Sequence, residues 1–249
     1  MNIKILEQSV KSLFLKAQFK GNCLASGTGF LAKSPIGHVL ITNRHIVTGR
    51  NNDTDELLSL TGGFPTELVI SHNKKNVLGE WVTCTEPLYN QNNQPLWHEH
   101  PTLGSKADVV ALPLTYTNEV ELRTYNLDEG SSIPYPKPSD RVSVVGFPFG
   151  RSTGGGMAIW VTGFVASEQE LPEPKFLIDS RTRPGQSGSP VIAQHNNGCT
   201  YIADDGTTKM IMGTITQFIG IYSGRINRES DIGIVWKASI LKELVNSLS

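Results

Sequence analysis

A serine lies between two glycines in the run Gly185-Gln186-Ser187-Gly188-Ser189-Pro190. Glycine adopts backbone angles that other residues avoid, so this run predicts a tight turn whose backbone other groups can approach closely. Ser, Gly and Pro are also common in ordinary turns, and the run by itself is equally compatible with one of those. The residues upstream of it decide between the two interpretations.

A serine hydroxyl becomes a good nucleophile only when a base takes its proton and a third group orients that base. His45 follows the apolar residues 39–41 and is predicted to lie at the end of a strand. Asp108 interrupts the apolar run 107–112, and a buried carboxylate needs a partner. Taken singly, His45 could be a surface residue and Asp108 the cap of a strand. Their occurrence together, in the order His45, Asp108, Ser187, favours a catalytic interpretation.

Three segments of the chain resemble the signature segments of chymotrypsin-fold (trypsin-like) serine proteases. They are Thr42-Asn43-Arg44-His45, Ala107-Asp108-Val109-Val110-Ala111-Leu112 and the run around Ser187. The closest resemblance is to the bacterial branch that includes the HtrA/Deg proteases and the glutamyl endopeptidases. Residues 26–30, 146–150, 161–166 and 231–235 are also similar to segments of that branch. The resemblance extends from about residue 20 to the C-terminus.

This resemblance implies a role for each residue. Ser187 would attack the scissile carbonyl, His45 would transfer the proton, and Asp108 would orient His45. The backbone N–H groups of Gly185 and Ser187 would form the oxyanion hole, and Ser223 would donate a hydrogen bond to the Asp108 carboxylate. The expected function is therefore a serine endopeptidase, which acts on protein or peptide substrates and needs no cofactor or metal.

Gln186 departs from the pattern of the family. Secreted trypsin-like enzymes have Asp at this position and most HtrA relatives have Asn. In zymogen activation the Asp pairs with a newly cut N-terminus, and the neutral side chain of Gln186 cannot form that ion pair. Activation by N-terminal clipping is therefore not expected. Two alternatives remain: a catalytically silent or latent protease-fold module that acts through partner binding, and an active enzyme that a partner protein or an oligomer switches on.

The resemblance also places a substrate pocket between the residues that precede the nucleophile and the strand of Ser223. Its predicted members are Arg181, Thr182, Gly224 and Arg225. The two arginines predict a preference for an acidic or polar residue before the scissile bond. The competing interpretation is that both guanidinium groups point to solvent, as arginines usually do. The histidine that glutamyl endopeptidases use in this strand is replaced by Tyr222.

Short apolar segments separated by turns with Gly and Pro recur along the chain and predict an all-β fold. Together with the resemblance, they predict two six-stranded antiparallel β-barrels and a C-terminal α-helix. We expect one protease domain, with an N-terminal barrel at about 20–127, a linker at about 128–139 and a C-terminal barrel and helix at about 140–249. Too few residues follow Ser187 for a PDZ domain. Residues 86–106 are rich in Asn, Gln and Pro and resemble an insertion between two strands of the first barrel. In the second barrel, residues 210–217 and 218–223 are predicted to form two successive strands.

The composition excludes several other classes of protein. A net charge of −1 gives no sign of nucleic-acid binding. No apolar run reaches the roughly 18 residues of a transmembrane helix, and the N-terminus lacks a signal-peptide core. Cys23, Cys84 and Cys199 are widely spaced and do not suggest a disulfide framework. We therefore expect a cytoplasmic protein with free thiols that binds neither nucleic acid nor membrane, although a chain that had lost its leader would look similar.

Two further motifs are weak evidence for a metal site and for a phosphate-binding loop, respectively. In Trp97-His98-Glu99-His100 the two histidines could suggest metal ligands, but no cluster of Cys or His accompanies them, and no metal site is expected. Gly154-Gly155-Gly156 lacks the Lys and Ser or Thr of a phosphate-binding loop. We expect a flexible turn there, near the substrate cleft.

Overall fold

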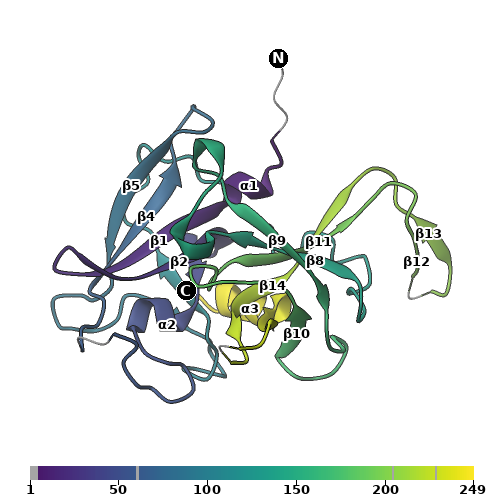
Figure 1. The fold of residues 1–249 in the computed structure, drawn as a ribbon. Helices are drawn as coiled ribbons and strands as arrows, with labels where there is room; N and C mark the ends of the chain where they lie inside the picture. Colours follow the sequence, from purple (N-terminus) through teal and green to yellow (C-terminus); the bar gives the residue numbers. More distant parts are fainter. Residues whose placement is uncertain (1–4, 60–61, 204, 228) are drawn as a thin grey trace.

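The computed structural model describes residues 5–59, 62–203, 205–227 and 229–249, in which most of the regular structure is β-strand, as predicted (Figure 1). The first half contains α1 (Gln8–Lys11), β1 (Ser12–Phe19), β2 (Asn22–Ser34), β3 (Gly37–Thr42), α2 (Arg44–Thr48), β4 (Glu67–Asn73), β5 (Trp81–Pro87), β6 (His98–Glu99) and β7 (Val110–Pro113). The second half contains β8 (Arg141–Gly146), η1 (Pro148–Gly150), η2 (Gly154–Gly156), β9 (Ile159–Val165), β10 (Lys175–Asp179), β11 (Pro190–His195), β12 (Thr200–Ile202), β13 (Thr208–Met210), β14 (Ile215–Arg225), β15 (Ile232–Lys237) and α3 (Ala238–Asn246).

The first half forms a seven-stranded sheet in the order β5-β4-β1-β2-β3-β7-β6. It has one strand more than expected, because the predicted insertion at 86–106 contributes the two-residue strand β6, which pairs with β7. Alternation of side chains along β4 turns Leu68, Ile70 and His72 toward the protein interior, where all three are fully buried. His72 thus occupies a position where the pattern calls for an apolar residue.

The second half forms the expected closed six-stranded barrel, in the order β10-β15-β14-β11-β8-β9. The prediction of two strands over 210–217 and 218–223 is wrong. A single strand, β14, runs through 215–225, because the run 216–222 is buried throughout and pairs with β11 on one side and β15 on the other.

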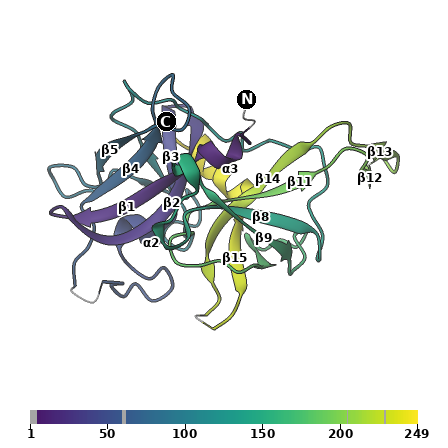
Figure 2. The same ribbon diagram turned by 45° about the horizontal axis from the view of Figure 1, so that its top comes forward.

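A hairpin of β12 and β13 leaves the second barrel between β11 and β14 and extends away from the rest of the molecule (Figures 1 and 2). The side chains of Ile202, Met210 and Met212 on this hairpin are largely exposed. No sequence pattern indicates this hairpin, because each of its strands has only three residues.

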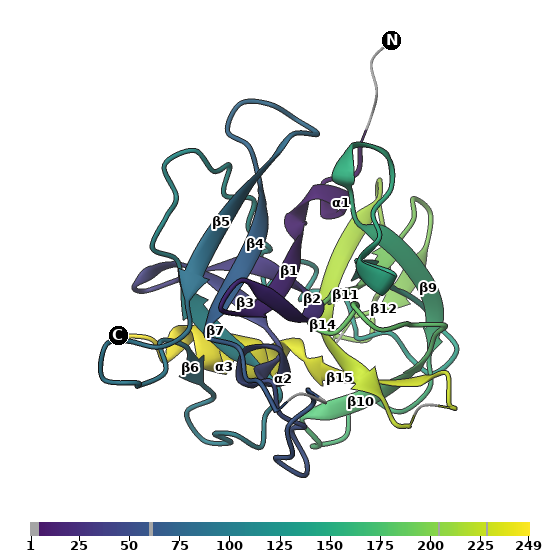
Figure 3. The same ribbon diagram turned by 60° about the vertical axis from the view of Figure 1, so that its left-hand side comes forward.

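The two halves share one hydrophobic core. The ring of Phe30 from β2 lies 5.5 Å from that of Phe218 in β14, and Tyr125 packs against both rings. The expected C-terminal helix, α3, contacts β2 and β7 of the first half and β14 and β15 of the second (Figure 3). This shared core holds loops from both halves in fixed positions relative to one another. In the described ranges, no helix is both long and apolar enough to cross a membrane.

Candidate active site

His45 lies just beyond the end of β3, in the first turn of the short helix α2. Its backbone N–H donates to Oδ1 of Asp108 at 2.9 Å, and its ring Nδ1 lies 2.7 Å from Oδ2 of the same carboxylate. The side-chain amide of Asn43 donates to the Asp108 carbonyl at 2.7 Å. Asp108 therefore holds both the backbone and the ring of His45.

The Asp108 carboxylate is almost fully buried, with 4% of the residue exposed. Besides the two contacts with His45, it accepts a hydrogen bond of 2.5 Å from the hydroxyl of Ser223, which β14 contributes from the other half. Three polar partners around one buried carboxylate offset the cost of removing its charge from water.

The environment of His45 determines how readily it takes a proton. Burial by itself would lower its pKa, but the negative charge of Asp108 and the hydrogen bond to it act in the opposite direction and prevail. The pKa of His45 is therefore raised above 6.5. An imidazole of this kind is a stronger base than a free histidine.

The segment Trp97-His98-Glu99-His100 makes polar contacts with both α2 and α3. Glu99 forms an ion pair of 2.8 Å with Arg44, the residue before His45. His100 is buried, its Nδ1 accepts the N–H of Leu103 at 3.2 Å, and its Nε2 lies 3.4 Å from Glu243 of α3. Across the described ranges, no three His, Cys, Asp or Glu side chains form a group that could hold a metal ion.

The nucleophile loop, residues 183–189 around the predicted nucleophile Ser187, is attached to β2 through Thr28. The Thr28 N–H donates to the Ser187 carbonyl at 2.8 Å, and the Thr28 hydroxyl donates to the Gly185 carbonyl at 2.9 Å. Gly188 has a φ of +85°, and a Cβ atom there would collide with the Thr28 carbonyl oxygen. Only glycine fits at position 188 while this close approach is kept.

Ser187 and His45 line the same cleft, which has a volume of about 470 Å³. The Ser187 hydroxyl donates to the carbonyl oxygen of Ser223 at 3.2 Å. Among the hydrogen bonds of the described residues, none joins this hydroxyl to the ring of His45. The predicted nucleophile and base are thus brought to one cleft, but they are not hydrogen-bonded to one another.

The two predicted oxyanion donors are unpaired. The backbone N–H groups of Gly185 and Ser187 have no acceptor within the described part of the chain. Gly185 has a φ of +94°, and a Cβ atom on it would collide with the carbonyl oxygen of Phe147. The loop therefore requires glycine at position 185 for both conformation and space.

Gln186 is fully buried and directed back onto its own loop. Its side-chain Oε1 accepts the N–H of Arg183 at 2.8 Å, and its backbone N–H donates to the Arg183 carbonyl at 3.2 Å. This pair of bonds closes the turn that carries Gly185 and requires no charged partner.

Two of the four predicted pocket residues line the cleft and two do not. Gly224 and Arg225 line the cleft, whereas Arg181 is exposed and lies outside its lining. Thr182 is fully buried and does not line the cleft, and its hydroxyl lies 2.6 Å from the hydroxyl of Tyr222. The prediction that Arg181 and Thr182 face the substrate is therefore not met in this structure.

The cleft also contains residues that sequence reasoning missed. They are Asn51, Asn52, Asp53 and Leu58 from the loop after α2, together with Lys175, Pro184, Ile234 and Trp236. Polar residues after a helix are typical of any surface loop, so the sequence carries no signal that would have identified the loop as part of the site.

Residues 27–198 match the family model of the trypsin-like peptidase domain, a span that includes His45, Asp108 and Ser187. A crystal structure of the serine endoprotease from Yersinia pestis is similar in fold, with a TM-score of 0.50 and 14% identity, over 97% of this chain and 66% of that one. The chain thus spans slightly less than two thirds of that protein. The inactive form of the Rv3671c protease matches with a TM-score of 0.47 and 18% identity, over 96% of this chain and 88% of that one. No curated protein sequence matches the chain.

Proposed function

Because this chain belongs to the trypsin-like peptidase family, we propose that it is a serine endopeptidase that uses His45, Asp108 and Ser187. The observation that carries the proposal is the set of hydrogen bonds around Asp108. They join His45 from the first half to Ser223 from the second, beside the cleft that Ser187 lines. A buried carboxylate that holds a histidine ring beside a serine is the arrangement that general-base activation of a hydroxyl requires.

In the proposed reaction, the Nδ1–H of His45 donates a hydrogen bond to Asp108 and keeps its proton, which leaves Nε2 free to act as the base. The Ser187 hydroxyl rotates from the Ser223 carbonyl toward Nε2, and its oxygen bonds to the scissile carbonyl carbon as the proton passes to His45. His45 then delivers that proton to the leaving amine as the C–N bond breaks. Water repeats the two steps on the acyl-enzyme, which releases the acid product and restores Ser187.

The negative charge on the carbonyl oxygen needs hydrogen-bond donors during both steps. The N–H groups of Gly185 and Ser187 are proposed for this role, because neither has an acceptor among the described residues. In other enzymes, loss of one such donor lowers kcat by on the order of 10² to 10³.

The bonds between Gln186 and Arg183 support a loop that does not depend on a newly cut N-terminus. We therefore propose that the enzyme is not activated by N-terminal clipping. A latent state is the second candidate, and the bond from the Ser187 hydroxyl to the Ser223 carbonyl favours it. In that case a substrate, a partner protein or an oligomer would turn the hydroxyl toward His45.

The substrate preference is proposed from the charges in the cleft. Arg225 and Lys175 line it, and their positive charges support an acidic or polar residue near the scissile bond. Asp53 lines the same cleft and opposes this preference. Cleavage of a library of unstructured peptides would reveal the preference, and a plain preference for Ala or Leu would rule the acidic one out.

The endopeptidase activity is tested by following cleavage of the same peptides by mass spectrometry. Ser187→Ala should abolish cleavage. Ser189→Ala is the matched control, because Ser189 lies in the same loop and its buried hydroxyl has no hydrogen-bond partner in the described structure. Equal cleavage by the wild type and Ser187→Ala would contradict the proposal.

A further inference from the structure

Phe149, in the loop between β8 and β9, has an unusual backbone conformation for a residue with a side chain. Its φ of +55° and ψ of +25° lie in the left-handed region. Such a conformation is unfavourable for a bulky residue and persists only where the surroundings hold it. The Phe149 side chain is 64% exposed, so packing of the ring does not explain the conformation. The explanation must come from the backbone.

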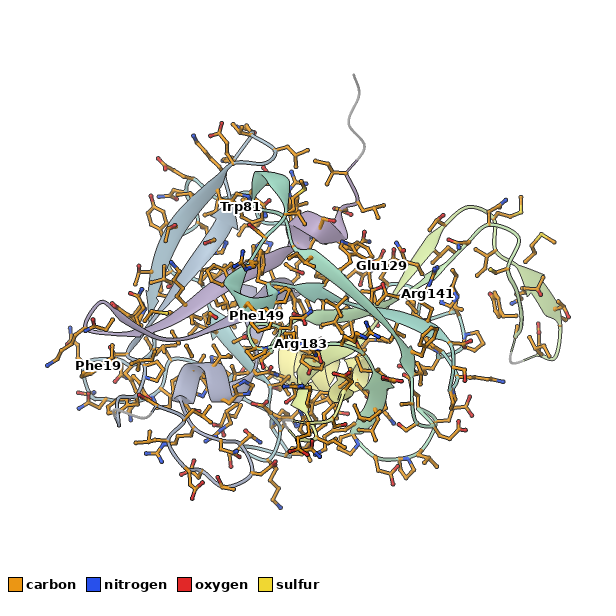
Figure 4. All side chains as sticks on the ribbon, in the orientation of Figure 1. Phe19, Trp81, Glu129, Arg141, Phe149 and Arg183 are labelled. Atoms are coloured by element: carbon orange, nitrogen blue, oxygen red, sulfur yellow. The ribbon has the colours of Figure 1, made fainter. Side chains whose placement is uncertain are left out.

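The backbone N–H of Phe149 makes a contact outside its own turn. It donates to the carbonyl oxygen of Pro184 at 2.6 Å and so joins the β8–β9 loop to the nucleophile loop. Figure 4 labels Phe149 and Arg183, which lie on these two loops near the centre of the molecule. The left-handed conformation of Phe149 is therefore associated with a bond to the residue immediately before Gly185.

This bond determines where the N–H of Gly185 points. The peptide bond between Pro184 and Gly185 is trans, as are the others in the described ranges. In a trans peptide the C=O and the N–H of one unit point in opposite directions. Since the Pro184 carbonyl is directed at Phe149, the Gly185 N–H is directed away from it. Rotation of this peptide unit would turn a carbonyl oxygen to the side that now presents the N–H.

We propose that Phe149 is a positioning residue, whose backbone N–H keeps the Gly185 N–H available as an oxyanion donor. This inference rests on the proposed endopeptidase function. The role belongs to the backbone of Phe149, and the aromatic ring is not required for it. Replacements at this position should therefore act according to how well each residue accepts a positive φ.

The loop that carries Phe149 is attached at both ends. At the near end, the Phe147 N–H donates to the Thr28 hydroxyl at 3.2 Å. At the far end, the indole N–H of Trp81 donates to the Gly155 carbonyl at 2.7 Å. Trp81 begins β5, so this bond fixes the loop to the β4–β5 hairpin (Figure 4). Loss of the Trp81 bond should loosen the loop and weaken the hold on Pro184.

Three variants at position 149 test the proposal. Phe149→Asn, Phe149→Val and Phe149→Thr all remove the ring and all keep the backbone N–H. Asn adopts the left-handed conformation readily, whereas the β-branched Val and Thr resist it. We expect kcat for peptide cleavage to be about tenfold lower in the Val and Thr variants than in the Asn variant, with KM within about twofold. Because the side chain is exposed, the three variants should differ in unfolding temperature only by the few degrees that strain at one backbone position produces.

Trp81→Phe provides a second test, because it keeps an aromatic ring but removes the indole N–H together with part of the indole ring. It should lower kcat by severalfold and leave KM unchanged. Trp160→Phe is its matched control, since it makes the same side-chain change and removes an indole N–H bond of 2.9 Å to the Ser9 hydroxyl, which joins β9 to α1 instead of the β8–β9 loop to β5. Trp160→Phe should leave kcat unchanged.

The outcomes separate this proposal from the function on which it rests. Equal kcat values for the Asn, Val and Thr variants of an active enzyme would overturn the positioning role alone. Absence of cleavage that depends on Ser187 in the wild type would overturn both proposals. A kcat that follows the β-branched pattern, with unfolding temperatures that differ by only a few degrees, supports the role of Phe149.

Discussion

The Thr28 hydroxyl donates a hydrogen bond of 2.9 Å to the carbonyl oxygen of Gly185, although 157 residues separate them in the sequence. The same hydroxyl accepts the N–H of Phe147 at 3.2 Å. One buried side chain in β2 of the first half therefore holds two loops of the second half. The position of the Gly185 peptide depends on both halves of the chain.

Thr28→Val keeps the shape of the side chain and removes its hydroxyl. The Gly185 carbonyl and the Phe147 N–H would then be buried without this partner, which should lower the free energy of unfolding by about 1–3 kcal/mol. The kcat should fall as well, because both loops lose a common support. Chemical denaturation and peptide-cleavage kinetics measure the two effects.

Thr216→Val is the control for this variant, because the Thr216 hydroxyl accepts a bond of 3.1 Å from Gln8, which does not contact the nucleophile loop. It should cost stability and leave kcat unchanged. If Thr28→Val and Thr216→Val had equal kcat values, the Thr28 hydroxyl would have no role beyond stability.

The raised pKa of His45 predicts how activity depends on pH. The base must be neutral to accept the Ser187 proton, so kcat/KM should fall on the acid side with a midpoint above pH 6.5. Asp108→Asn removes the charge that raises the pKa of His45 and leaves the burial that lowers it. The midpoint should therefore move to lower pH, while the maximum of kcat/KM falls by about 10⁴.

Ser223→Ala separates two effects of Asp108 on His45, the effect of its negative charge and the effect of how its carboxylate is oriented. It removes one hydrogen bond to the carboxylate and keeps the contact between His45 and Asp108. Its midpoint should stay near that of the wild type, and its activity should fall much less. An acid midpoint that does not move in Asp108→Asn would disprove the assigned partnership.

His72 makes the fold sensitive to acid. It is fully buried, neither ring nitrogen has a hydrogen-bond partner in the described structure, and burial lowers its pKa to about 4. The unfolded chain, with an ordinary pKa near 6.5, therefore binds this proton more readily than the folded chain does. The contribution of neutral His72 to the free energy of unfolding is therefore fully present above about pH 6.5. It is lost as the pH falls toward 4, and the loss reaches about 3 kcal/mol at pH 4.

His72→Leu should remove this part of the pH dependence, because leucine suits an apolar position and does not titrate. Urea unfolding of both proteins between pH 4 and pH 7.5 measures the difference. If the two free energies of unfolding decreased in parallel with falling pH, His72 would not be the source of the acid sensitivity.

The bonds between Gln186 and Arg183 predict that the enzyme does not need a free N-terminus. Adding ten residues before Met1 should therefore leave the rate of peptide cleavage unchanged. The rate is compared before and after a site-specific protease removes the extension. An increase on removal would show that activity depends on the N-terminus after all.

The sequence predicts the core of the candidate site because its residues carry local signals. His45 follows an apolar run, Asp108 interrupts one, and Ser187 stands between glycines. The structure brings His45, Asp108 and Ser223 into contact and places Ser187 in the same cleft. Such residues can be found without a structure because their types and their order are unusual.

The backbone conformation of Phe149 and the orientation of Thr182 could not be predicted from the sequence. A positive φ is commonly expected at a glycine, but no residue near Phe149 in the sequence indicates that this phenylalanine has a positive φ. Thr182 is predicted to face the substrate, yet its hydroxyl turns to Tyr222, whose ring packs against Gly233. That orientation depends on how β14 and β15 pack, which is a tertiary effect beyond the reach of local patterns.

Labelling with a fluorophosphonate probe tests the central claim most directly, because such probes react with serines that a neighbouring base activates. The wild type should be labelled, and peptide mapping should find the adduct on Ser187. Ser187→Ala should not be labelled, whereas Ser189→Ala should be labelled as the wild type is. An unlabelled wild type, or equal labelling of the wild type and Ser187→Ala, would contradict the claim that Ser187 is the activated nucleophile.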